Sequence, residues 1–315
     1  MRLTKKTIGL FLFLLFLPEI LLLTSSYYFS SKILKFERLS LEKDATLLKI
    51  KSYKDFGLPD PEEIEFENEG VKLSGWFFSQ TTSSTPKCGV ILSHGYSRTR
   101  MGVLKFTPLF WKRGCSLFLY DHRAHGKSGG EFTTYGYYEK LDMLEALKVF
   151  KDKTGLQDNR IGIFGISYGA ATALQMAPFN DRLAFVGADA PYGDLKRIIR
   201  ERTEVLYSKK LIFLIPFALY AASIRADFEP ESVSPIDSAS RIRIPVFLSH
   251  SREDAYTSVE HSIEINKNLF TSKKRFHITE WGAPHGKSID TNFIAYDRQM
   301  DEFLRTYTKG FEVSE

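Results

Sequence analysis

The sequence predicts an α/β fold, with a mostly parallel sheet covered by helices on both faces, an N-terminal antiparallel hairpin and an inserted helical cap. Three observations lead to this prediction. Six short apolar segments alternate with helical segments, a pattern that builds parallel β-α-β units. Two segments of alternating polarity precede them around Gly70. Residues 192–243 interrupt the alternation with an interval long enough for a cap.

The chain begins with basic residues and a long apolar run, which predicts a membrane anchor. The run from Ile8 to Phe29 is long enough, as a helix, to cross a bilayer core of about 30 Å. Glu19 makes the span imperfect, because a carboxylate near its middle costs about 3 kcal/mol on insertion scales. A cleaved signal peptide is the alternative. Both interpretations place the folded domain outside the cytoplasm.

Composition shifts divide the chain into three parts. Residues 1–36 form the anchor or signal segment, and residues 37–60 form a charged, mostly helical linker that ends in the helix-breaking "LPDP". Residues 61–315 form the folded domain, with the cap at about 192–243. At 43% hydrophobic content this domain can bury one substantial core.

The net charge argues against a nucleic-acid-binding protein. The chain carries a formal charge of +5, of which +4 falls in the first 36 residues and +1 in the remainder. A nucleic-acid surface needs basic residues massed on the folded domain. Proximity to a membrane explains the N-terminal bias better.

The core elements follow in order along the chain. "EIEFEN" and "VKLSGWFF" predict the hairpin, and leucines at helical spacing predict a helix over residues 138–151. The ligand site of such a sheet lies beyond the carboxyl ends of its strands. The six predicted parallel strands are "GVILSHG", "SLFLYD", "RIGIFG", "LAFVGAD", "PVFLSH" and "KRFHITE".

Cys88 and Cys115 are the only cysteines, and each opens a predicted strand. Two cysteines cannot build a disulfide framework or a Cys-rich metal site. Two unpaired buried thiols are the simpler expectation. A bridge becomes feasible if the two strands are neighbours and the compartment is oxidising.

The cap interval contains the apolar stretch "KKLIFLIPFALYAASI", residues 209–224. This stretch is too short, and too interrupted by Pro216, to span a bilayer. It suits a lid helix that lines an apolar pocket. The alternative is a core helix with no special role.

"GISYG", Gly165 to Gly169, predicts a nucleophilic serine. Ile161 to Ile166 read as a buried strand and Ala170 to Ala177 as a helix, so almost no residues remain for the turn. Gly165 and Gly169 let the strand fold back sharply onto the helix. Ser167 would then stand clear of the backbone at the helix N-terminus.

Seven histidines are candidates for the base that activates Ser167. His285, in "WGAPHGKS", lies in a glycine-rich loop past the last strand, and we predict that it is the base. His277 lies within that strand, and His261 lies on a helix. The other four lie at or just past strand ends and could line the site: His94, His122, His125 and His250.

The acid that orients the base is expected after a strand between the serine and the histidine. "PVFLSHSREDAYTS" places Asp254 in the loop after the penultimate strand, and Glu253 and Asp189 are the alternatives. The resulting order, serine, acid, histidine, is the one that a strand-turn-helix nucleophile requires. Chymotrypsin-like and subtilisin-like enzymes have other orders.

The oxyanion of a tetrahedral intermediate needs two preorganised N–H donors. Tyr168, directly after the nucleophile, supplies the first. "SHGYSR" supplies the second, because Gly95 lets the backbone approach the substrate and the Tyr96 amide can point into the site.

These motifs resemble those of the α/β-hydrolases, in the branch of serine aminopeptidase-like and Bem46-like membrane-anchored hydrolases. The resemblance covers nearly all of residues 60–315. It implies hydrolysis through an acyl-enzyme, with no metal or organic cofactor. The matching segments are "HGY" at 94–96, "DHRAHGKS" at 121–128, "GISYG" at 165–169, "HSRED" at 250–254 and "GAPHG" at 282–286. Ala124 and Ser251 stand where the family usually has glycine.

Three functions follow as hypotheses. The first is a serine hydrolase that cleaves small or lipid-like carboxylic esters at Ser167, with amides as a further substrate class. The second is a peptidase, but an aminopeptidase needs free cap carboxylates, and Glu201 and Glu204 are interleaved with arginines. The third is a membrane-tethered scaffold without activity.

Overall fold

The computed structural model describes the backbone of residues 5–80 and 86–313, and the side chains of these ranges from residue 15 onward. The strands are β1 (Glu62–Asn68), β2 (Val71–Phe78), β3 (Cys88–Ser93), β4 (Cys115–Tyr120), β5 (Ile161–Ile166), β6 (Phe185–Asp189), β7 (Val246–Ser251) and β8 (Lys274–Thr279). The α-helices are α1 (Lys5–Leu34), α2 (Leu41–Leu48), α3 (Thr107–Trp111), α4 (Glu139–Thr154), α5 (Tyr168–Met176), α6 (Leu195–Leu206), α7 (Ile215–Ala226), α8 (Pro235–Ala239), α9 (Val259–Asn268), α10 (Ser288–Thr291) and α11 (Phe293–Tyr307). Short 3-10 helices are η1 (Tyr53–Phe56), η2 (Arg100–Phe106), η3 (Asp158–Arg160), η4 (Ala177–Phe179), η5 (Lys209–Leu214) and η6 (Pro230–Ser232).

One sheet organises the fold, in the order β1-β2-β4-β3-β5-β6-β7-β8. The pairs β1·β2 and β2·β4 are antiparallel, and all the others are parallel. Every residue of β3, β4, β5, β6 and β7 is buried, as expected of parallel strands covered on both faces. The predicted fold class, including the N-terminal hairpin, is therefore confirmed.

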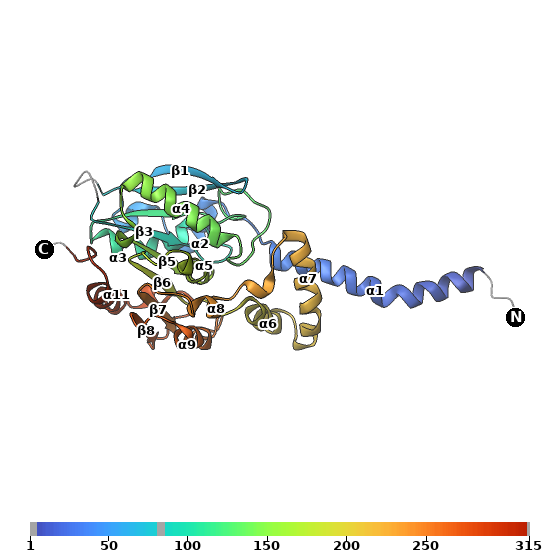
Figure 1. Ribbon diagram of the computed structural model, residues 1–315. Helices are drawn as coiled ribbons and strands as arrows, with labels where there is room; N and C mark the ends of the chain where they lie inside the picture. Colours follow the sequence, from blue (N-terminus) through green and yellow to red (C-terminus); the bar gives the residue numbers. More distant parts are fainter. Residues whose placement is uncertain (1–4, 81–85, 314–315) are drawn as a thin grey trace.

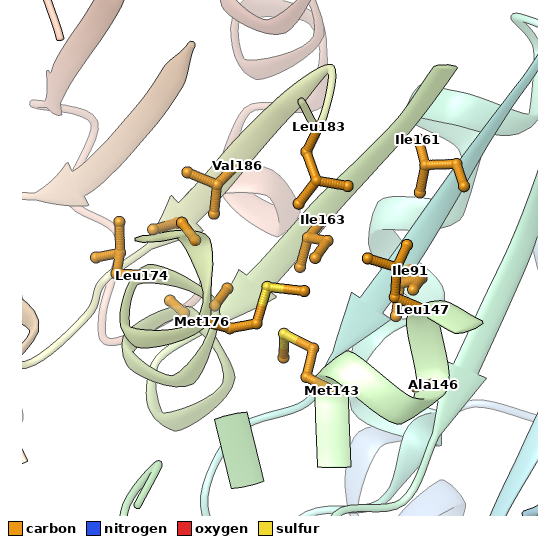
Figure 2. Close-up of a cluster of buried hydrophobic side chains, with 14 of the residues drawn as sticks. Ile91, Met143, Ala146, Leu147, Ile161, Ile163, Leu174, Met176, Leu183 and Val186 are labelled. Atoms are coloured by element: carbon orange, nitrogen blue, oxygen red, sulfur yellow. The ribbon is translucent and has the colours of Figure 1, made fainter. Parts of the chain in front are cut away.

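The sheet divides the main core into two layers. Ile91 and Ile163 point to the layer covered by α4, α5, α8 and α9, where they meet Leu147 and Leu174 (Figure 2). Residues one position along each strand face the opposite layer, under η2, α3 and α11, as Phe164 does. This alternation holds the strands rigidly beneath the loops at their carboxyl ends.

Cys88 and Cys115 form a disulfide, so our expectation of two free thiols was wrong. The two residues face each other in the parallel register of β3 and β4, with their Cα atoms 4.4 Å apart. This separation lies within the range that a disulfide can span. The sequence left the pairing open because the adjacency of the two strands is a property of the sheet order.

Helix α1 projects from the body of the molecule, and its C-terminal part lies beside α7 (Figure 1). Arg225 of α7 holds it there, donating to the hydroxyls of Ser30 at 2.6 Å and Ser31 at 2.7 Å. Over the stretch that the structure describes, no helix has the length and apolar character that crossing a bilayer requires. The predicted anchor begins at Ile8, and the side chains of residues 8–14 lie outside the described part.

The segment predicted as a linker, residues 37–60, lies against the sheet-bearing domain. Asp44 of α2 is fully buried and accepts hydrogen bonds from the Thr99 amide at 2.7 Å and from Arg98 at 3.0 Å. These two residues lead into η2, next to the loop that follows β3. The domain boundaries that we placed at residues 36 and 60 remain a prediction.

The interval between β6 and β7 holds α6, η5, α7, η6 and α8. Pro216 lies in the first turn of α7, where its missing N–H costs nothing, and so separates η5 from α7. Helices α6 and α7 lie on the side of the domain from which α1 projects (Figure 1).

Candidate active site

Ser167 occupies a strained turn between β5 and α5. Its backbone angles are φ 53° and ψ −115°, outside the regions that L-residues prefer. A Cβ on Gly165 would lie 2.3 Å from the Gly169 carbonyl oxygen, and one on Gly169 would lie 2.3 Å from that of Ser93. Only glycine fits at either position. The turn therefore presents the serine hydroxyl at the carboxyl edge of the sheet.

Ser167, His285 and Asp254 form a continuous hydrogen-bonded row. The His285 Nδ1 atom lies 2.6 Å from Asp254 Oδ2, and its Nε2 atom lies 2.8 Å from Ser167 Oγ. Nδ1 faces a carboxylate and must carry the ring proton, which leaves Nε2 free to accept from the serine hydroxyl. This arrangement can remove a proton from Ser167 and return it later.

Asp254 is buried and held by several donors. The amides of Tyr256 and Thr257 each donate to its Oδ1 at 2.9 Å. Burial alone would raise its pKa, but hydrogen bonds from His250 and His285 outweigh burial and keep the pKa well below its usual range. Asp254 is therefore ionised and can orient the imidazole.

The alternative acids do not reach the imidazole. Glu253 lies beside Ser251, whose hydroxyl donates to it at 3.2 Å. Asp189 is buried and accepts the Tyr296 hydroxyl at 2.7 Å, while its backbone carbonyl accepts the Ser167 amide at 2.7 Å. Asp189 thus fixes the nucleophile turn through its main chain.

Of the remaining histidines, His250 and His261 hold other parts of the structure. The ring of His250 lies 2.9 Å from the Thr257 carbonyl and steadies the loop that carries the acid. His261 Nε2 lies 2.9 Å from Glu201 of the cap. His277 lies on β8. His122 and His125 are fully buried, and burial lowers the pKa of both rings.

His94 fixes the loop expected to hold the oxyanion. Its Nε2 accepts the His122 amide at 3.0 Å, so its Nδ1 bears the proton and donates to the Gly95 carbonyl at 2.8 Å. Burial lowers the pKa of His94 and keeps the ring neutral. Because the carbonyl and the following N–H of a trans peptide point in opposite directions, this bond turns the Tyr96 amide away from His94.

The two amides expected to bind the oxyanion have no protein acceptor among the described residues. Neither the Tyr96 N–H nor the Tyr168 N–H donates to a backbone or side-chain group there. Tyr168 is the first residue of α5, where amides are free to bind an anion. Gly95 comes close to the nucleophile, since a Cβ on it would lie 3.7 Å from the Ser167 Cβ.

A cavity of about 360 Å³ opens over Ser167, and most of its lining is apolar. Helices α6 and α7 and segment η5 form one wall, and tyrosines near the sheet edge form the floor. Its lining comprises Phe29, Lys32, Ile33, Lys35, Phe36, Tyr96, Tyr135, Ser167, Tyr168, Tyr192, Ile198, Ile199, Arg202, Thr203, Leu206, Tyr207, Leu211, Leu214, Ile215, Ala218, Tyr256 and Thr257.

The end of α1 and the residues after it form the wall that sequence reasoning missed. The Tyr135 hydroxyl donates to the Ile33 carbonyl at 3.1 Å, and the Thr133 amide donates to that of Leu34 at 3.0 Å. Phe29 and Phe36 line the cavity on either side of these bonds. The aromatic residues near the end of the apolar run were the available signal, but the run as a whole predicted a membrane anchor.

The cap carboxylates are paired away from the cavity. Glu201 accepts from Arg197 at 3.0 Å and faces His261, and Glu204 lies 3.5 Å from Arg200. Neither carboxylate lines the cavity, whose described lining contains no acidic residue.

The two departures from the family's glycines have different consequences. Ala124 adopts φ 61°, the left-handed conformation in which glycine is favoured, so the loop keeps its shape at a cost in strain. Ser251 ends strand β7, and its φ is not positive, so no glycine is needed there.

Comparison with known proteins supports the assignment to a family. Residues 104–311 match the model of the prolyl oligopeptidase family. The chain is 33% identical over 220 residues to the uncharacterized protein YqkD of Bacillus subtilis, covering 68% of this chain and 70% of that one.

Solved structures show the same fold. An esterase from Pyrococcus furiosus superposes with a TM-score of 0.67 at 25% identity, covering 87% of this chain and all of that one. An acylaminoacyl peptidase from Pyrococcus horikoshii gives a TM-score of 0.63 at 18% identity, over 86% of this chain and 45% of that one. The chain belongs to the prolyl oligopeptidase family of the α/β-hydrolase superfamily and is a serine hydrolase.

Proposed function

We propose that the protein hydrolyses carboxylic esters through an acyl-enzyme, with Ser167 as nucleophile, His285 as general base and acid, and Asp254 as the group that orients the imidazole. The observation that carries this proposal is the row of hydrogen bonds from Asp254 through His285 to Ser167, at the floor of an apolar cavity. Ester cleavage is the reaction that this largely apolar lining, which holds lysines and an arginine but no carboxylate, favours.

In the first half-reaction, Ser167 Oγ attacks the acyl carbon while its proton passes to His285 Nε2. The tetrahedral intermediate collapses, and the leaving alcohol takes that proton. A water molecule then repeats the sequence on the acyl-enzyme and frees the acid. Asp254 stays ionised throughout and stabilises the imidazolium that forms in each step.

The developing oxyanion would be bound by the amides of Tyr96 and Tyr168. Both amides are unpaired among the described residues, and the α5 N-terminus favours negative charge. Removing one donor of this kind typically costs about 3 kcal/mol in the transition state.

The lining of the cavity favours esters over the substrates of an aminopeptidase. An aminopeptidase must bind a free ammonium, and the described lining offers lysines and an arginine but no carboxylate. The family's name keeps peptide hydrolysis as the second candidate. A panel of p-nitrophenyl esters against aminoacyl anilides separates the two, and turnover of anilides alone would contradict the ester proposal.

Activity-based labelling tests the nucleophile. We expect a fluorophosphonate probe to label the wild-type protein and not Ser167→Ala. Equal labelling of the variant would contradict Ser167 as the nucleophile, and an unlabelled wild type would favour the scaffold hypothesis. An acyl-chain-length series on the unlabelled wild-type protein then measures the size of the cavity.

We further propose that the protein is tethered to a membrane, with the catalytic domain, residues 61–315 and its cap at 192–243, outside the cytoplasm. The disulfide supports an oxidising compartment. Exposed apolar side chains on α1 and the cap support contact with lipid. They are Leu15, Phe16, Ile20, Leu21, Leu23, Tyr27, Tyr28, Val205, Leu206, Tyr207, Phe213, Phe217, Tyr220 and Ile224. Cell fractionation tests the tether, and recovery of the full-length chain in the soluble fraction would contradict it.

A further inference from the structure

Arg202 of α6 brings a positive charge into the cavity close to the proposed catalytic histidine. Its guanidinium carbon lies 3.9 Å from the centre of the Tyr256 ring. The same ring lies against His285, with ring centroids 4.9 Å apart. Arg202 and Ser167 line the same cavity, so a substrate at the nucleophile can also reach the guanidinium.

Among the residues that the structure describes, Arg202 has no ionic partner, unlike its neighbours on the helix. Arg197 pairs with Glu201 at 3.0 Å and with Glu264 at 2.8 Å, and Arg200 faces Glu204. Across the residues that the structure describes, no carboxylate oxygen lies within 4.0 Å of Arg202, and its buried Nε finds no acceptor. A buried N–H without an acceptor is costly, and an anionic ligand would satisfy it.

The charges around Arg202 favour an anion. Lys32 and Lys35 also line the cavity, and within the described part of the chain only Lys35 has a carboxylate partner, Glu131 at 2.5 Å. A planar guanidinium can bind a carboxylate or a phosphate through two parallel hydrogen bonds. In a mostly apolar cavity such a pair is poorly screened, so it can decide which ester is preferred.

We propose that Arg202 is a specificity-determining residue that binds an anionic group, a carboxylate or a phosphate, on one side of the ester substrate. The preferred substrates are then esters that carry a negative charge on the acyl or the alcohol part beside an apolar portion. This inference rests on the ester-hydrolase function proposed above.

Paired substrates that differ only in charge test the proposal. On the acyl side, the pair is p-nitrophenyl hydrogen glutarate and p-nitrophenyl pentanoate. On the alcohol side, it is 4-acetoxybenzoate and 4-acetoxybenzamide, with 4-acetoxyphenyl phosphate as the phosphate arm. Wild type, Arg202→Gln, Arg202→Lys and the control Arg200→Gln are compared by kcat/KM, after their melting temperatures show that each is folded. Arg200 is 63% exposed and does not line this cavity.

We expect Arg202→Gln to lower kcat/KM at least tenfold for an anionic ester, through KM, and less than threefold for its neutral partner. Arg202→Lys should recover part of the loss, and Arg200→Gln should change neither substrate. The side of the ester on which the loss occurs then locates the anionic group.

Equal losses for both members of every pair would show that Arg202 only holds Tyr256 against His285, and would overturn the proposal. A wild type that prefers the neutral esters would overturn it too. A wild type that cleaves none of the esters contradicts the proposed function instead, and the inference falls with it.

Discussion

At the scale of single residues, the site depends on backbone conformations with positive φ, which are unfavourable for residues that have a Cβ atom. Ser167 sits at φ 53°, and Ala124 at φ 61°. Strain of this kind costs about 1–3 kcal/mol per residue and persists only where the surrounding structure enforces it. At Ser167 the enforcing contacts are the close approaches of Gly165 and Gly169 to neighbouring main-chain carbonyls.

Two variants of the serine separate its chemistry from its strain. Ser167→Ala and Ser167→Gly both lack the hydroxyl, so both should lose hydrolysis and probe labelling. Only glycine relieves the backbone, and we expect Ser167→Gly to have a free energy of unfolding about 1 kcal/mol higher than Ser167→Ala, after the entropic cost of glycine. Urea unfolding measures the difference. A lower stability for the glycine variant would show that the turn is not strained.

His94 gives a second prediction at this scale, for a positioning residue. Because its Nδ1–H orients the peptide between Gly95 and Tyr96, His94→Ala should lower kcat between ten- and a hundredfold. KM should change little, since the oxyanion forms only in the transition state. Steady-state kinetics on one p-nitrophenyl ester measures both constants.

The control is Ser93→Ala. It disturbs the buried histidines beside His94 but leaves the hydrogen bond to the Gly95 carbonyl in place. Its hydroxyl lies 2.8 Å from His122 Nε2. We expect it to retain most of its kcat. Equal losses in the two variants, or a loss expressed only in KM, would mean that His94 acts through general packing.

At the scale of elements, the loops that follow β3, β5, β7 and β8 carry the proposed catalytic and oxyanion-binding residues. Their positions could be predicted from sequence, because short apolar strands and glycine-rich turns are local signals. The walls of the cavity could not be predicted from the sequence. The contact between α1 and α7, and the packing of Asp44 beneath η2, join segments far apart in the chain. No local pattern encodes such contacts.

Arg225 tests whether the contact between α1 and α7 shapes the cavity. Arg225→Ala removes the bonds to Ser30 and Ser31, so amide hydrogen exchange over residues 27–36 should become faster. KM for a long-chain p-nitrophenyl ester should rise severalfold, and KM for p-nitrophenyl acetate should stay within twofold. Arg243→Ala, which removes a cation–π contact with Phe270 remote from the site, serves as the control. If amide hydrogen exchange over residues 27–36 is unchanged in Arg225→Ala, Arg225 does not hold α1 against α7.

At the scale of the whole molecule, tyrosines that are buried or partly buried make stability sensitive to alkaline pH. Burial raises the pKa of Tyr96 to about 12, and it raises the pKa of other tyrosines well above the ordinary value. The others are Tyr120, Tyr135, Tyr168, Tyr192 and Tyr296. In the unfolded chain each loses its proton near pH 10, so the unfolded state then binds fewer protons than the native state. Stability therefore falls as the pH rises above about 10.

Each such tyrosine contributes a slope of about 1.4 kcal/mol per pH unit between its unfolded and folded pKa values. We expect Tyr96→Phe to make the fall of the unfolding free energy with pH less steep between about pH 10 and 12. The slope should decrease by the contribution of one tyrosine, about 1.4 kcal/mol per pH unit. Chemical unfolding at a series of pH values, followed by tyrosinate absorbance, measures it. A variant slope equal to that of the wild type would show that Tyr96 titrates freely in the native protein.

The features that the sequence predicted depend on residues close together in the chain, and the features that it missed depend on segments far apart. The fold class, the strained turn and the chain order of Ser167, Asp254 and His285 follow from the positions of strands and turns. The pairing of Cys88 with Cys115 needed the sheet order, and the position of Arg202 beside Tyr256 needed the path of the cap. Both depend on which distant segments pack together, which one chain's local patterns do not specify.

Because the C-terminal end of α1 lines the cavity, we expect substrate range to depend on residues 29–36. A truncated form that starts after residue 36 would keep Ser167, Asp254 and His285 but would lack Phe29 and Ile33. Its acyl-chain preference would then describe a wider, wetter opening than the intact enzyme presents. Substrate profiling therefore needs a chain that retains residues 29–36.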